Sequence, residues 1–145
     1  MKRFGLFVPA LLVLAACASR AEPSRSFDAA GLAPSLVVER FLQAANRQDL
    51  ETMARLWGTA EGLVIERDPR AEVEKRLFAT ALILQHDDFE IQGEQIVPGR
   101  PEAKQIIVRM QIGERQVPVA YTLVRSKKRG WLVESIDLEA ITARR

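Results

Sequence analysis

Four basic residues lie within five positions near the C-terminus: Arg125, Lys127, Lys128 and Arg129. Positive side chains gathered on one short segment attract anionic lipid headgroups or a polyanionic polymer. A run of charge at the tip of a hairpin is also commonly a solvated turn. No aromatic residue separates these bases to stack on a nucleobase, which argues against nucleic acid as the partner. The cluster is therefore a candidate surface interaction site.

The single histidine, His86, is followed by two carboxylates, Asp87 and Asp88. A zinc site usually needs three or four protein ligands, and residues 34–145 contain no second histidine and no cysteine. A histidine at a helix C-terminus interacts favourably with the helix dipole, and a pair of aspartates favours a turn. We therefore expect neither a metal nor a cofactor here.

Cys17 is the only cysteine of the chain, and it follows a segment typical of a secretory signal. Lys2 and Arg3 form a basic start, and residues 4–16 are apolar almost throughout. A membrane-spanning helix needs about 20 apolar residues, more than this run of 13 provides. The segment is therefore predicted to be a cleaved signal rather than an anchor.

The end of that segment, Leu14-Ala15-Ala16-Cys17, resembles the lipobox of bacterial lipoproteins. The resemblance implies cleavage before Cys17, diacylglycerol on its thiol and further acyl chains such as palmitate, and two chains suffice for stable anchoring. Ala18 after the cysteine then favours sorting to the outer membrane, facing the periplasm. In the alternative, Cys17 is an ordinary thiol behind a cleavage site or half of an intermolecular disulfide.

Composition limits the rest of the chain to one small globular domain. The 145 residues are 48% hydrophobic and 28% charged, too apolar for disorder and too poor in cysteine for a disulfide scaffold. Removing Lys2 and Arg3 with the signal leaves 19 of the 21 basic side chains against 19 acidic ones. The mature chain therefore has no overall basic charge to bind nucleic acid.

The sequence divides into three predicted segments. Residues 1–16 are the predicted signal peptide, 17–33 the lipidated cysteine with a flexible tether, and 34–145 the folded domain. The tether mixes small and polar residues without a regular period. The alternative to a flexible tether is a short helix around Phe27 to Leu32 that docks on the domain through these two apolar residues.

Apolar spacing predicts three helices in the first half of the domain. Pro34 suits the first turn of a helix that ends near Asn46, Asp49 caps a second helix that ends at Gly58, and Asp68 caps a third. The third helix should bury Val73, Leu77, Ala81 and Leu84, with Phe78 and Leu82 beside them. Phe41, Trp57, Phe78 and Trp131 are the bulky residues expected to fill the interior.

From Phe89 the period changes to that of β-strands, which we place at 89–97, 104–112, 115–125 and 131–138. A turn at Gly113-Glu114 pairs Met110 with Val117, Val108 with Val119 and Ile106 with Tyr121, so that one face is apolar. The fold class is α+β, with three N-terminal helices on a curved, cone-like four-stranded antiparallel sheet.

The run from Val37 to Leu50 resembles the opening of the nuclear transport factor 2-like superfamily, which has a cystatin-like cone. The strand Gly130-Trp131-Leu132-Val133 and its ending Ile136-Asp137-Leu138 are similar too. The resemblance covers about residues 34–138 and implies a fold rather than an activity. Many small bacterial lipoproteins carry such a domain, and sheets of this type often pair into a homodimer.

Enzymes of that superfamily place a carboxylate and hydrogen-bond donors inside the cone. Here Tyr121 faces the core, and the last strand is expected to add Asp137 if Leu123 pairs with Val133, or Glu134 if the register slips by one. Burial would raise the pKa of such a carboxylate toward that of a general base. No catalytic motif accompanies these residues.

The sequence therefore favours an envelope-anchored, non-catalytic binding or interaction module. Its partners would be the membrane, through the anchor at Cys17, and an envelope protein or polyanion. The alternative is a small-molecule carrier or enzyme that uses a pocket inside the cone.

Overall fold

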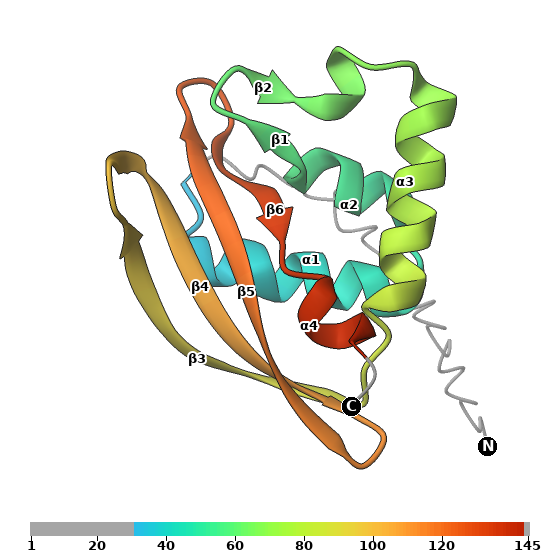
Figure 1. Cartoon of the computed structure of the whole chain (residues 1–145). Coiled ribbons are helices and arrows are strands. Elements are labelled where there is room, and N and C mark those ends of the chain that lie inside the picture. The colour runs from blue at the N-terminus through green and yellow to red at the C-terminus, as the bar shows by residue number, and fades with distance from the viewer. Residues whose placement is uncertain (1–30, 144–145) are drawn as a thin grey trace, which may run out of the picture.

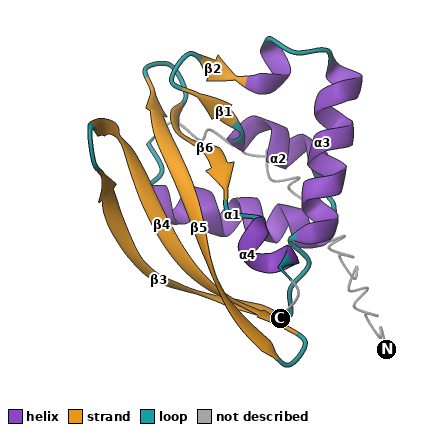
Figure 2. Cartoon of the chain, in the orientation of Figure 1, coloured by secondary structure: helices purple, strands orange, loops and turns teal. Residues whose placement is uncertain are grey.

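The computed structural model describes residues 31–143 and has an α+β fold (Figure 1). Four α-helices accompany a four-stranded antiparallel sheet and a separate two-stranded sheet (Figure 2). The predicted signal segment, Cys17 and residues 18–30 of the predicted tether lie outside the described residues.

The elements follow one another in a simple order. The helical part contains α1 (Pro34–Arg47), α2 (Leu50–Leu56), β1 (Gly58–Thr59), β2 (Gly62–Leu63), the 3-10 helix η1 (Val64–Glu66) and α3 (Arg70–Ile83). The large sheet and the C-terminus contain β3 (Asp88–Val97), β4 (Arg100–Ile112), β5 (Arg115–Ser126), β6 (Gly130–Ile136) and α4 (Glu139–Thr142).

Helix α1 begins and ends where its sequence dictates. Pro34 occupies its first turn, where a missing N–H costs no hydrogen bond. Gln48, with a φ of 53°, ends the helix in the left-handed conformation, and its N–H donates to the last carbonyls. Asp49 then caps α2 by accepting a hydrogen bond from the Thr52 N–H at 3.0 Å. The predicted helical hairpin is confirmed.

Helix α3 starts one residue later than predicted, and Asp68 does not cap it. Pro69 is the capping residue, without a side-chain hydrogen bond, and the Asp68 carboxylate binds Arg76 at 2.5 Å instead. The guanidinium draws the carboxylate away from the helix N-terminus, so the predicted cap is wrong.

Four short elements, β1, β2, η1 and α4, were not predicted from the sequence. The segment between α2 and α3 contains the small β1–β2 hairpin and η1. Gly58 is buried in that hairpin, where a Cβ would lie 2.4 Å from the Gly62 carbonyl oxygen. The chain after β6 contains α4, which buries Ile141.

The large sheet has the order β3-β4-β5-β6. Its central hairpin has the predicted register, including the pair Ile106 and Tyr121. Strand β4 begins at Arg100 rather than near Lys104, because the Pro98-Gly99 turn leads directly into pairing with Val97. Helix α1 crosses one face of this sheet (Figure 1) and contacts β4 and β6.

The core lies between that sheet face and the helices, and Phe41 is the one of its four predicted bulky residues that is fully buried. Phe41 is 1% exposed, whereas Phe78 is 46% exposed. Trp57 and Trp131 are partly buried at the margin of the core. Helix α3 packs on α1 and α2 rather than on the sheet, so only its stripe of Val73, Leu77 and Ala81 is buried. The expectation that Phe78 fills the interior is wrong.

Candidate functional site

Tyr121 lies in the core, as predicted, with no exposed surface. Its hydroxyl donates a hydrogen bond to the Met110 Sδ at 3.3 Å. Desolvation by burial raises the pKa of the Tyr121 hydroxyl well above its ordinary value. The hydroxyl therefore stays protonated and is engaged by a neighbouring core side chain.

Neither candidate carboxylate joins Tyr121 in the core. Leu123 does pair with Val133, but a β-bulge next to Thr122 pairs Tyr121 with Ile136. The extra residue in β6 inverts the inward and outward alternation beyond Val133. Asp137 is consequently exposed and caps α4 by accepting from the Ala140 N–H at 3.3 Å.

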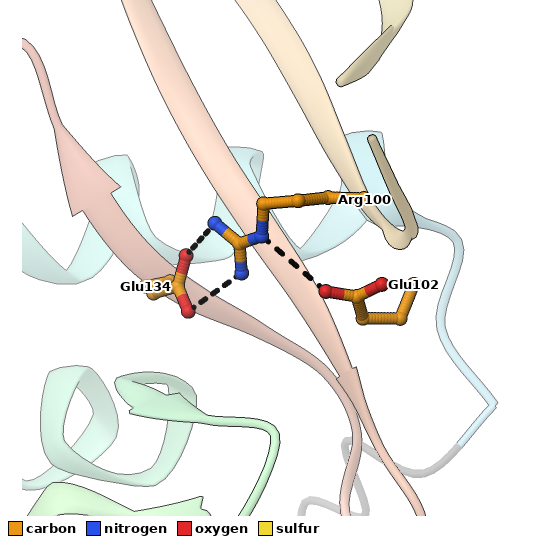
Figure 3. A network of polar contacts seen from close by, with 3 residues as sticks. All are labelled: Arg100, Glu102 and Glu134. Carbon is orange, nitrogen blue, oxygen red and sulfur yellow. Dashed lines mark hydrogen bonds and ion pairs between the residues drawn. The ribbon is translucent and has the colours of Figure 1, made fainter. Parts of the chain in front are cut away.

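Glu134 belongs to a network of polar contacts away from the core (Figure 3). The Arg100 guanidinium binds it through two parallel hydrogen bonds of 2.8 and 3.0 Å, and the Arg100 Nε lies 3.3 Å from Glu102. Hydrogen bonding to Glu134, and then to Glu102, raises the pKa of Arg100. The expectation that the last strand adds a carboxylate to the core face is therefore wrong.

A groove of about 820 Å³ lies at the end of the sheet where β5 turns into β6. We call it the basic groove. Its lining residues are Gly31, Pro101, Glu102, Lys104, Arg125, Ser126, Lys127, Lys128, Gly130 and Trp131. Four of these residues are basic and one is acidic, so the lining attracts anions.

The strand register explains how distant residues meet in the basic groove. Lys104 pairs with Leu123, and Arg125 pairs with Trp131. Cross-strand partners share a sheet face, so these side chains lie on the face that buries Leu123, beyond the part covered by helices. The Lys104 ammonium lies 5.5 Å from the centroid of the Trp131 ring, within the range of a cation–π interaction.

The basic residues of the groove differ in how their charges are compensated. Lys104 forms an ion pair with Glu94. Arg125, Lys127 and Lys128 have no hydrogen-bond or ion-pair partner among residues 31–143. These three exposed cations are therefore the part of the groove that lacks a counterion within the described part of the chain.

Arg129 belongs to a different surface. It forms an ion pair with Glu66 of η1 and does not line the basic groove. The sequence cluster thus divides into three cations on the groove and one that ties the last hairpin to the helical part. Sequence reasoning missed Lys104 and Trp131 as groove residues, although the register it predicted for Lys104 could have indicated the first.

His86 is held by contacts with a backbone carbonyl and with a side chain of α1. Its Nδ1 lies 2.7 Å from the Leu84 carbonyl oxygen, and the Asn46 side chain accepts from its backbone N–H at 3.1 Å. Within residues 31–143, no group of three or more His, Cys, Asp and Glu side chains is arranged to hold a metal ion.

Over the same described range, no helix has the length and apolar character needed to cross a membrane. In comparisons with known proteins, no family model, no curated protein and no solved structure matches this chain.

Proposed function

We propose that this chain is a lipid-anchored lipoprotein of the bacterial envelope whose domain is a non-catalytic interaction module. Residues 1–16 are a signal peptide, Cys17 carries the lipid, and residues 17–33 tether the domain to the outer membrane on its periplasmic side. The lipobox at Leu14-Ala15-Ala16-Cys17 supports this assignment. The helical hairpin followed by an antiparallel meander supports a nuclear transport factor 2-like domain.

The basic groove carries the functional part of the proposal. Arg125, Lys127 and Lys128 present positive charge on an exposed surface without a counterion among residues 31–143, which favours reversible binding of an anionic partner. The one carboxylate of the lining set, Glu102, accepts a hydrogen bond from the Arg100 Nε at 3.3 Å, and no histidine lines the groove to activate the Ser126 hydroxyl. Binding is therefore the activity that this groove supports best.

The alternative of an enzyme or carrier needs a polar pocket inside the core. Tyr121 is instead engaged by Met110, and Glu134 is bound by Arg100 outside the core. These contacts favour the surface site over the interior.

The anchor is tested by Cys17→Ser. We expect this variant to remain an unprocessed precursor that takes up no labelled fatty acid, because the thiol is the lipid acceptor. Normal trimming and normal labelling of Cys17→Ser would contradict the lipoprotein assignment.

The choice between groove and interior is tested by two sets of variants of the lipidated protein. Replacing Arg125, Lys127 and Lys128 by Gln should weaken retention of anionic envelope components, and salt should weaken it too. Tyr121→Phe should leave retention unchanged. Loss of retention in the Tyr121→Phe variant alone would contradict the interaction module and favour a binding pocket inside the core.

A further inference from the structure

The described chain starts at the basic groove. Gly31, the first described residue, is one of the groove's lining residues, and Figure 1 shows the chain entering α1 beside the end of the sheet where β5 turns into β6. Thirteen residues, 18–30, separate it from Cys17. As a flexible chain they would span about 20 Å on average. A lipid on Cys17 would therefore keep the basic groove close to the bilayer surface.

Anionic phospholipid headgroups carry charge of the sign that would balance the exposed cations of the groove. Arg125, Lys127 and Lys128 are exposed and have no partner among the described residues. A basic side chain near an anionic membrane surface contributes on the order of a fivefold gain in binding. Three such residues on one tethered surface therefore favour docking of the groove on an anionic membrane, even when no other contact forms.

An exposed apolar residue lies next to Lys104 of the basic groove. Ile96 of β3 is 85% exposed, the most exposed of the four large apolar side chains at the surface. It pairs with Lys104 in the register, so the two side chains share a sheet face. The other three, Leu36, Phe78 and Leu82, lie on α1 and α3.

This combination distinguishes a bilayer from a soluble polyanion. A membrane interface offers phosphate charge and, a few ångströms deeper, an apolar layer that can accept an isoleucine side chain. A soluble polymer of phosphates or carboxylates offers the charge alone. The neighbouring Trp131 is partly buried, and tryptophan is favoured where one part of a side chain is apolar and another is wet.

We infer that the basic groove is a docking surface for anionic phospholipid headgroups of the membrane that carries the lipid anchor, with Ile96 entering the interface. The inference rests on the proposed lipid anchor, and it adds that the domain lies against the bilayer rather than at the end of a free tether. Docking would orient the opposite end of the molecule, at the β4–β5 turn, away from the membrane.

The test uses the full lipidated protein with Trp57→Phe, so that Trp131 is the only tryptophan. The protein is inserted into phosphatidylcholine vesicles with or without phosphatidylglycerol, each containing a lipid with a dansyl group on its headgroup. Energy transfer from Trp131 to dansyl reports how closely the groove approaches the surface. We expect higher transfer with phosphatidylglycerol, and a decrease as salt is raised.

Two neighbouring residues supply a matched pair of variants. Lys128→Gln and Arg129→Gln remove the same charge from the same turn, but only Lys128 lines the groove, while Arg129 pairs with Glu66. Lys128→Gln should lower the ratio of docked to undocked protein about fivefold, and the three groove cations together about a hundredfold. Arg129→Gln should change it much less.

Ile96→Ser separates the bilayer from a soluble polyanion. It should lower transfer in phosphatidylglycerol vesicles while leaving the binding of soluble polyphosphate unchanged. Equal transfer in both kinds of vesicle, or equal losses from Lys128→Gln and Arg129→Gln, would overturn the inference. Groove-dependent polyphosphate binding without vesicle docking would also overturn it, in favour of a soluble partner.

The mass of the purified protein distinguishes the two failures. A protein without lipid on Cys17 would contradict the proposed function itself. A lipidated protein whose Trp131 signal ignores phosphatidylglycerol would contradict the docking inference alone.

Discussion

Strand β5 passes through two regions of opposite character. From Val117 to Leu123 its alternate side chains are buried against the helices, and the hydroxyl of Tyr121 finds a partner within the core. Beyond this stretch, Arg125 of β5 and Lys127 and Lys128 of the following turn are exposed cations without partners in the described residues, whereas Arg129 pairs with Glu66. Under the proposed function, stability depends on one stretch of β5, and binding depends on the end of β5 and the turn that follows it. Variants in one region should therefore leave the other property unchanged.

Phe41→Ala should have the largest effect on the packed region. The ring is 1% exposed, and truncation of a buried phenylalanine costs about 3 to 5 kcal/mol. Urea or thermal unfolding measures the loss. Phe78→Ala is the matched control, because that ring is 46% exposed and should cost far less. Equal losses would contradict the placement of α3 on α1 and α2.

Gly58→Ala tests whether the β1–β2 hairpin packs against β6 as tightly as Phe41 packs in the core. A Cβ at this position would lie 2.4 Å from the Gly62 carbonyl oxygen and 2.6 Å from the Leu132 Cδ1. Overpacking of this kind costs about 1 to 3 kcal/mol. Gly93→Ala in β3 has open space within 4 Å and should be nearly neutral in the same unfolding experiment. A neutral Gly58→Ala would show that the β1–β2 hairpin yields easily.

Asp49→Ala should cost about 1 kcal/mol through loss of the α2 cap. Hydrogen bonds from Thr52, first from its side chain and then from its backbone, lower the pKa of the Asp49 carboxyl from 3.8. A lowered folded-state pKa contributes stability above pH 3.8, and that contribution is lost as the pH falls through the folded-state pKa. Asp49→Asn keeps a capping oxygen and should flatten this part of the pH profile of unfolding. An unchanged profile would mean that Asp49 does not contribute to acid sensitivity.

Tyr121→Phe should change the free energy of unfolding by less than about 1 kcal/mol. A typical hydrogen bond contributes about 0.5 to 1.5 kcal/mol net, and the sulfur of Met110, the acceptor here, is only a weak one. The ring that fills the core is retained. A large loss would mean that the hydroxyl has a role beyond this one contact.

The sequence predicted those parts of the fold that depend on local pattern. Helix α1, its hairpin with α2 and the pairing of Ile106 with Tyr121 follow from apolar spacing, a capping aspartate and a two-residue turn. These features depend on residues close together in the chain, and their physics is visible in the sequence.

Features that depend on tertiary packing could not be predicted in this way. The bulge beside Thr122 inverts the alternation of β6 and moves Asp137 to the surface. A bulge inserts one residue and has no reliable signature in the local sequence. Strict alternation of inward and outward residues therefore placed Asp137 on the wrong face of the sheet. The exposure of Phe78 likewise depends on α3 resting on helices rather than on the sheet.

The candidate site was predictable only in part, for the same reason. Lys127 and Lys128 are visible as a charge run, whereas Lys104 reaches the groove from another strand through the register. The separate role of Arg129 depends on Glu66, which lies 63 positions earlier in the chain. Clusters in sequence therefore indicate a charged surface, and the fold decides which charges share it.

The smallest effect on stability is expected from Lys128→Gln. Surface substitutions away from specific contacts usually change the free energy of unfolding by no more than about 0.5 kcal/mol, and Lys128 is exposed without a partner among residues 31–143. Removing one of several neighbouring cations also relieves repulsion, so the change could be slightly stabilising. Arg129→Gln removes the same charge but breaks an ion pair in which both side chains are 48% exposed; such pairs contribute about 0 to 1 kcal/mol. Lys128→Gln should therefore unfold at a urea concentration equal to or above that of Arg129→Gln. The opposite order would mean that Lys128 supports the fold, and the division between a stabilising stretch of β5 and a binding turn after it would then fail at this residue.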